Sequence, residues 1–188
     1  MLILGLRAAH VTRTITKEVN SMPGTVIGKT LNYGYPGQIS RQGDEVSRTR
    51  PVKEGTNNIY FGAPIVINAD GTCQVMGTGH KAENFAGVAM RRVKSALEYP
   101  NQNRVYYMPN EACDILERGS ITVECINGTP TVGGDVYVYV VAASGHKLGE
   151  FSATADAANT VKLTNARWGS DKDARNVAEL TLITRQGV

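Results

Sequence analysis

The strongest alternation of apolar and polar residues in the chain falls between Gly119 and Val141. A period of two residues is typical of strands that bury one face. The turn-forming pairs Asn127-Gly128 and Gly133-Gly134 separate two alternating runs. The apolar positions of these runs are Ile121, Val123, Cys125, Val136, Val138 and Val140. The pattern predicts two antiparallel strands, paired as a hairpin, at the centre of a β domain.

Seven further short segments have the composition of strands, with valine, isoleucine, threonine and tyrosine prominent among them. They are Ile59–Ile67, Gly71–Met76, Phe85–Val93, Arg104–Met108, Leu148–Thr154, Thr160–Leu163 and Val177–Thr184. Pro64 cannot donate to a strand ladder and predicts an edge or a bulge, and the polar residues after Trp168 predict a loop. The 20 glycines lie mostly between these runs. The sequence therefore predicts an all-β fold: a single small β-barrel or β-sandwich domain with very little helix.

The first 32 residues lack this strand pattern. The largely apolar residues 2–6 are followed by a threonine-rich polar stretch, and Pro23-Gly24 interrupts any regular element. We expect residues 1–32 to form an extended N-terminal arm and residues 33–188 to form the β-rich domain.

Residues 33–58 are rich in glycine, proline and charged side chains. They are expected to form a long loop or extended connection, with one short strand around Val46–Thr49. Tyrosine and arginine, the residue types enriched at protein interfaces, recur in this segment. The candidate interface residues are Tyr33, Tyr35, Arg41, Arg48 and Arg50. The alternative is that the tyrosines pack against the surface of their own domain.

The net charge of +3 is small but unevenly distributed, since residues 1–60 hold eight basic and four acidic side chains. The chain contains no run of five like charges and no basic stripe studded with aromatic residues, so no direct nucleic-acid contact is expected. No stretch approaches the roughly 20 apolar residues of a membrane helix, and residues 1–6 are too short for a signal peptide.

The cysteines and histidines do not form a recognisable metal or catalytic pattern. They are Cys73, Cys113, Cys125, His10, His80 and His146. Neither zinc-ligand spacing nor a C-x-x-C pair occurs, and an odd number of cysteines favours reduced thiols. Asp44-Glu45 and Asp171/Asp173 lack the graded oxygen ligands of a calcium loop. The sequence therefore predicts no catalytic, cofactor-binding or metal-binding residue.

Several strings, most of which contain glycine, form an ordered set along the chain. They are YGYPGQISRQGDEVSRTRPV from Tyr33, IYFGAPIVI from Ile59, FAGVAMR from Phe85, GSITV from Gly119, GDVYVY from Gly134, LGEF from Leu148 and LTNARW from Leu163, followed by Val177–Thr184. Each string is short, and it is their order that resembles the structural cement, or head decoration, proteins of tailed double-stranded DNA bacteriophages. The resemblance covers residues 33–184.

The resemblance implies a β-rich virion protein, made in the host cytoplasm, that binds the outer surface of the major capsid protein lattice. It further implies homotrimers at the three-fold and quasi-three-fold positions of the expanded head, which they stabilise against the pressure of packaged DNA. No cofactor, catalysis, membrane or nucleic acid is implied.

Three other functions fit parts of the sequence. A tail- or fibre-associated phage protein would share the strand-rich composition. A thiol hydrolase would use Cys113 with His80 or His146 as its base, although the sequence gives no reason for these groups to meet. A β-sandwich carbohydrate-binding module would present Tyr137 and Tyr139 on one sheet face, where they serve equally well as cross-strand packing partners.

Overall fold

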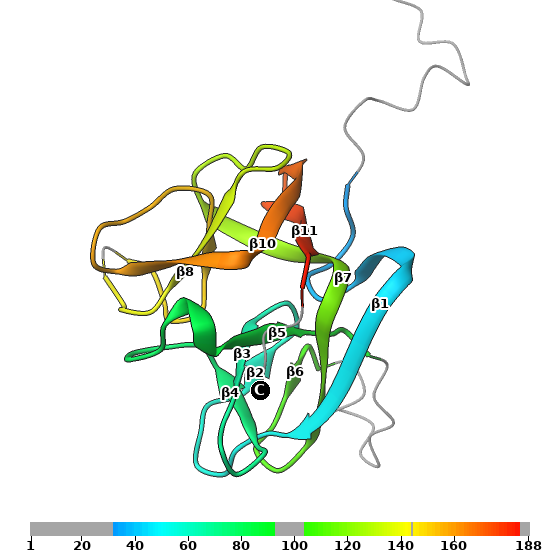
Figure 1. The fold of residues 1–188 in the computed structure, drawn as a ribbon, viewed down its shortest axis with the longest axis vertical. Helices are drawn as coiled ribbons and strands as arrows, with labels where there is room; N and C mark the ends of the chain where they lie inside the picture. Colours follow the sequence, from blue (N-terminus) through cyan, green and yellow to red (C-terminus); the bar gives the residue numbers. More distant parts are fainter. Residues whose placement is uncertain (1–31, 93–103, 144, 185–188) are drawn as a thin grey trace, which may run out of the picture.

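The computed structural model describes residues 32–92, 104–143 and 145–184, and it places most of them in strands (Figure 1). The strands are β1 (Ile39–Pro51), β2 (Ile59–Tyr60), β3 (Pro64–Ile67), β4 (Cys73–Val75), β5 (Phe85–Ala89), β6 (Tyr106–Tyr107), β7 (Ala112–Asn127), β8 (Asp135–Tyr139), β9 (Phe151–Ser152), β10 (Thr160–Lys172) and β11 (Val177–Leu182). A single 3-10 turn, η1 (Ala82–Asn84), precedes β5. The predicted all-β class is confirmed. The predicted arm lies outside the described residues, apart from Asn32.

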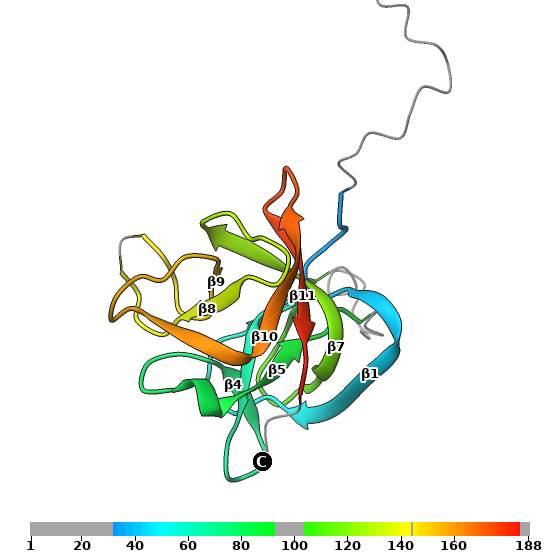
Figure 2. The same cartoon turned by 45° about the horizontal axis from the view of Figure 1, so that its top comes forward.

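Five strands close into a small barrel in the order β7, β11, β10, β8 and β9 (Figure 2). The ring closes because β7 pairs with both β11 and β9. Closure removes the free edges that an open sheet would leave. The apolar side chains of these strands pack into one buried cluster around Trp168 and Phe151. The barrel is therefore the hydrophobic centre of the fold.

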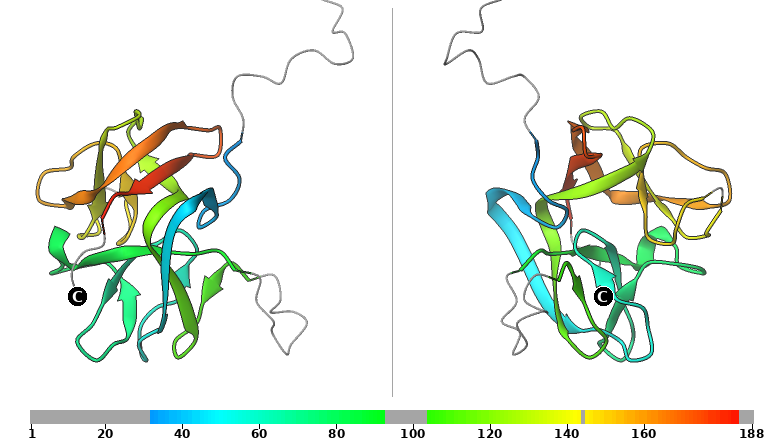
Figure 3. Two further views of the ribbon diagram at one scale, coloured as in Figure 1. Left: turned by 45° about the vertical axis from the view of Figure 1, so that its right-hand side comes forward. Right: turned by 180° about the vertical axis from the view of Figure 1, so that it is seen from behind.

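The first half of β7 carries a sheet extension on the other side of Gly119. Ile115 and Leu116 pair with β5 on one edge and with β1 on the other, so β7 lies between them. Strands β3 and β4 continue the sheet beyond β5, and β2 pairs with β6 beside it (Figure 3). A second buried cluster, which includes Ile59, Ile65 and Tyr107, fills this part of the molecule.

The predicted hairpin between the two best-patterned strands is wrong in its pairing. Both strands exist, but β9 lies between β7 and β8, with Phe151 opposite both Cys125 and Val138. The connection from β7 bonds to β10, since the Gly133 N–H donates to the Trp168 carbonyl oxygen over 2.7 Å. The alternation of apolar residues identifies a buried face, but it does not identify the neighbouring strand.

The segment 33–58 contains more strand than predicted: the short strand expected around Val46–Thr49 is part of β1, which takes 13 of these residues. No residue of β1 is fully buried. The strand forms through backbone pairing with β7, which requires no apolar pattern.

Two smaller boundaries differ from the prediction. Strand β10 continues through Gly169 to Lys172, where a polar loop was expected, because Arg167, Trp168 and Lys172 all pair with β11. The apolar run at Ile59–Ile67 is split into β2 and β3, since Gly62 takes a φ of 81° and turns the chain there.

Candidate interaction surface

Strand β1 is an exposed edge strand beside the barrel. Among the described residues it pairs only with β7 as a strand, so its outer edge offers backbone donors and acceptors to solvent. Its register shifts between Ile39 and Arg41, between Arg41 and Val46, and between Val46 and Ser47. Such bulges and charged side chains are the usual protection of an edge against indiscriminate pairing. The edge can therefore accept only a partner that fits its irregular shape.

Two of the three candidate arginines on β1 bind carboxylates of their own domain. The Arg41 Nε lies 2.7 Å from Oε1 of Glu179 on β11, and this hydrogen bond raises the pKa of Arg41. The Arg48 Nε lies 3.1 Å from Oε1 of Glu117 on β7. Both glutamates are buried, and each arginine covers one of them from the β1 side. These ion pairs fasten β1 to the barrel and to the sheet extension.

The third arginine, Arg50, is partly buried at the far end of β1. Its carbonyl oxygen accepts a 3.7 Å contact from the Cys73 Sγ, and its guanidinium lies close to Gly71. Its Nε is buried without a hydrogen-bond partner in the described part of the chain. Arg50 therefore packs between β1 and β4.

Of the two candidate tyrosines, Tyr33 attaches the segment before β1 to the end of β10 and to the β10–β11 turn. The Tyr33 hydroxyl donates to Asp171 Oδ1 over 2.8 Å, and this bond raises the pKa of Tyr33. The Tyr33 N–H donates to Asp173 Oδ2 over 3.1 Å. The side chain of Tyr35 remains exposed, with the Arg91 Cζ 4.6 Å from its ring centroid and the Arg175 Cζ 5.8 Å away.

Arg91 and Arg175 were not among the residues that sequence reasoning selected. Arg91 follows β5 and Arg175 lies in the β10–β11 turn, so no spacing in the sequence joins them to Tyr35. The fold brings Arg91 there through a short backbone bond, in which its N–H donates to the Gly37 carbonyl oxygen over 2.6 Å. Tyr33 and Tyr35 thus lie with these arginines, whereas Arg48 and Arg50 lie farther along β1.

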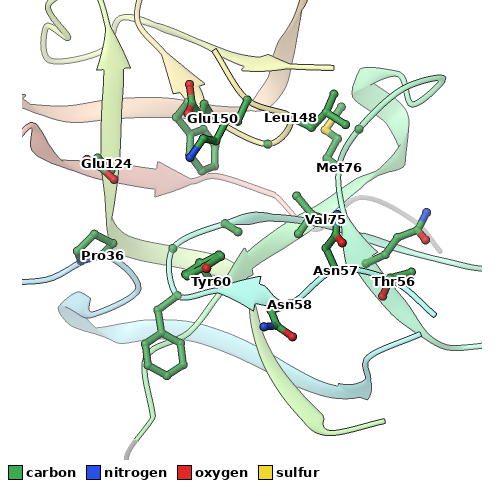
Figure 4. A pocket seen from close by; sticks show the side chains of 18 of the residues that line it. Pro36, Thr56, Asn57, Asn58, Tyr60, Val75, Met76, Glu124, Leu148 and Glu150 are labelled. Carbon is green, nitrogen blue, oxygen red and sulfur yellow. The ribbon is translucent and has the colours of Figure 1, made fainter. Parts of the chain in front are cut away.

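A groove of about 1070 Å³ opens beside Tyr35. Its walls come from the residues around β2, the β3–β4 side of the sheet extension and the loop before β9. Pro36 and Glu124 lie at one end and Met76 and Leu148 at the other, with Tyr60 between them (Figure 4).

The arrangement of cysteines and histidines does not support a thiol active site. Cys113 is fully buried. The His80 ring contacts Gln74 and Gly77, and the His146 ring stacks on Tyr139. A hydrogen bond with Cys113 lowers the pKa of Cys73, whereas burial raises that of Cys125.

The described ranges contain neither a candidate metal site nor a candidate membrane-spanning helix. They contain no group of three or more histidine, cysteine or acidic residues that could hold a metal ion, and no helix long and apolar enough to cross a membrane. Tyr139 is fully buried and Tyr137 is partly buried, so the two rings do not form the exposed platform of a sugar-binding sheet.

Comparison with known proteins was made for sequence and fold separately. The family model described as "Structural cement protein (E217 gp24/Pam3 gp6)" matches residues 22–183. The fold is similar to that of a chain in the solved structure "The capsid of Myoviridae Phage XM1", with a TM-score of 0.64 and 14% sequence identity over 89% of this chain and 99% of that one. No curated protein sequence matches the chain.

Proposed function

The chain belongs to the phage structural cement protein family and has a structural role in association with the capsid, and we propose that it binds the outer surface of the major capsid protein lattice and stabilises the expanded head. The protein acts there without catalysis. It is a homotrimer at the three-fold and quasi-three-fold positions.

The observation that carries the proposal is the exposed edge of β1. Strand β1 has 13 residues, most of them polar or charged, and lies beside the barrel. No described residue pairs with the backbone groups on its outer edge. Addition of a strand or an extended segment to such an edge is a common form of protein recognition. A capsid subunit that presents an extended segment would complete this sheet.

The candidate residues divide between two roles in the proposed contact. Tyr35 presents an exposed aromatic side chain to the partner, as interface anchors do. Tyr33, Arg41, Arg48 and Arg50 hold the segment 33–51 against the domain and shape the surface that the capsid subunit meets.

Residues 1–32 form an arm that adds contacts with neighbouring subunits. Deleting residues 1–32 is expected to leave residues 33–188 folded but to lower capsid occupancy.

Stabilisation follows from preferential binding to one state of the shell. A ligand that binds only the expanded lattice shifts the equilibrium toward that lattice by mass action. A trimer that bridges several subunits gains further from high effective concentration once its first contact forms. Many weak contacts per copy therefore suffice for a stable shell.

The test uses DNA-filled heads assembled without this protein. We expect such heads to release their DNA at a lower temperature than complete heads, and added protein to restore the release temperature. A dye that fluoresces on free DNA reports the release. Unchanged release in the presence of bound protein would contradict the stabilising role.

A further inference from the structure

Exposed apolar side chains are concentrated in the groove. Eight large hydrophobic residues are exposed in the described part of the chain, and four of them line this one groove. These four are Tyr35 (53% exposed), Tyr60 (58%), Val105 (46%) and Leu148 (44%). A concentration of exposed apolar surface within polar surroundings marks an interaction site.

The Tyr35 end of the groove also holds an arginine, Arg91, that forms no salt bridge with the described carboxylates. Six of the nine described arginines form salt bridges with acidic side chains: Arg41, Arg48, Arg92, Arg104, Arg118 and Arg167. Arg91 and Arg175 form none with the described residues, and both are exposed. Their guanidinium groups flank the same tyrosine ring.

The contact with Tyr35 positions Arg91 for a carboxylate. Its Cζ lies 4.6 Å from the Tyr35 centroid and 5.8 Å from the Phe61 centroid, so two rings hold the guanidinium in place. A guanidinium that lies over a ring can still use its planar N–H donors for a bidentate contact with a carboxylate. Less conformational entropy is then lost when a partner binds.

The charges at this end favour an anionic partner. Glu124 is the acidic residue that lines the groove near Pro36. Arg91 lines the groove and forms no salt bridge with Glu124 or any other described residue, whereas Arg175 lies outside the lining and its charge acts on Asp173. The other acidic lining residue, Glu150, already contacts the His146 Nδ1 over 3.1 Å. A segment with one carboxylate at the Tyr35 end and apolar side chains along the remaining length would complement the groove.

We propose that this groove binds an extended segment of the capsid subunit in which an Asp or Glu precedes or follows apolar residues. The carboxylate meets Arg91 beside Tyr35, and the apolar side chains lie over Tyr60 toward Leu148. This inference rests on the proposed function and specifies the chemistry of its partner.

The first test compares neighbouring arginines. Arg91→Glu is expected to weaken binding to expanded empty heads roughly tenfold or more, the loss typical of a central interface anchor. Arg91→Lys keeps the charge but loses the planar stacking, and it is expected to give an intermediate loss. Arg92→Glu is the matched control, because Arg92 is also exposed but bonds Asp114 and does not line the groove. Equal losses for Arg91→Glu and Arg92→Glu would overturn the proposal.

The second test identifies the occupant directly. A photoreactive p-benzoylphenylalanine replaces Tyr60 on the groove floor, the protein is bound to expanded empty heads, and the cross-linked peptides are sequenced by mass spectrometry. A capsid-subunit peptide with an acidic residue beside apolar ones supports the proposal. Cross-links to a second copy of this chain, or none from fully bound protein, overturn it.

The binding of wild-type protein distinguishes a failure of the groove proposal from a failure of the proposed capsid function. If wild-type protein does not bind expanded heads at all, the proposed capsid function fails. If wild-type and Arg91→Glu proteins bind equally well and no capsid peptide is cross-linked, only the groove assignment fails.

Discussion

The barrel and the β1 edge lie side by side along β7, but different interactions hold them. The barrel strands bury apolar side chains such as Val138 and Leu180 completely. Strand β1 buries no residue fully and is held by backbone pairing with β7 and by the ion pairs of Arg41 and Arg48. One region therefore supplies stability, and the other supplies an exposed surface that a partner can bind. Substitutions should therefore affect stability very differently in the two regions.

The largest effect is expected inside the barrel. Val138→Asp places a carboxylate where the wild-type side chain is fully buried, and it should cost about 4 kcal/mol or more of unfolding free energy. Urea denaturation followed by circular dichroism measures the loss. Val132→Asp is the matched control, because Val132 is 78% exposed in a turn and should change stability by less than about 0.5 kcal/mol. A folded Val138→Asp protein with a wild-type midpoint would refute the core assignment.

An intermediate effect is expected where β1 meets the core. Arg48→Ala leaves the buried Glu117 without this cation, and we expect a loss of about 2 kcal/mol, below the usual cost of breaking a buried pair because the Arg48 side chain is 30% exposed. Adding Glu117→Gln should restore part of the stability. Arg118→Ala is the control, since its pair with Asp44 is exposed and should contribute little to stability. Equal losses for the two arginines would show that burial of Glu117 does not matter.

The smallest effect concerns the attachment of the segment before β1. Burial raises the pKa of Asp173, but backbone N–H donors of Val177, Arg175 and Tyr33 outweigh burial, and the net pKa lies below its ordinary value. A folded-state pKa below the unfolded one contributes stability above the unfolded pKa, and that contribution is lost as the pH falls through the folded pKa.

Asp173→Asn is therefore expected to lower stability by about 1 kcal/mol at pH 7 and by less at pH 3. Denaturation curves at the two pH values provide the measurement. A loss that is independent of pH would show that the ionised carboxylate is not what holds the Tyr33 segment.

The sequence predicts the barrel better than the edge because burial leaves an apolar pattern. The alternation at Val136, Val138 and Val140 locates β8 correctly, and the run from Val177 locates β11. Pairing leaves no such pattern, which explains why β7 and β8 were expected to form a hairpin although β9 separates them.

The candidate surface was only partly predictable for a related reason. Tyr33 and Tyr35 were selected because tyrosine is enriched at interfaces, and Tyr35 is indeed exposed. The arginines beside it come from residues 91 and 175, and only the fold brings them together. The internal partners of Arg41 and Arg48 could not be predicted either. Glu179 and Glu117 are far from these arginines in the sequence and lie on other strands, β11 and β7. A sequence shows which residue types are typical of interfaces. It does not show which of these residues bind their own domain and which remain available to another protein.

The most direct measurement of the central claim is the binding of purified protein to empty heads in two states. Expanded and unexpanded heads that lack the protein are incubated with it, and occupancy is determined by sedimentation and by imaging of the particles. We predict stoichiometric addition to the outer surface of expanded heads and none to unexpanded heads. Equal binding to both states, or signal on tails without signal on the shell, would contradict the account.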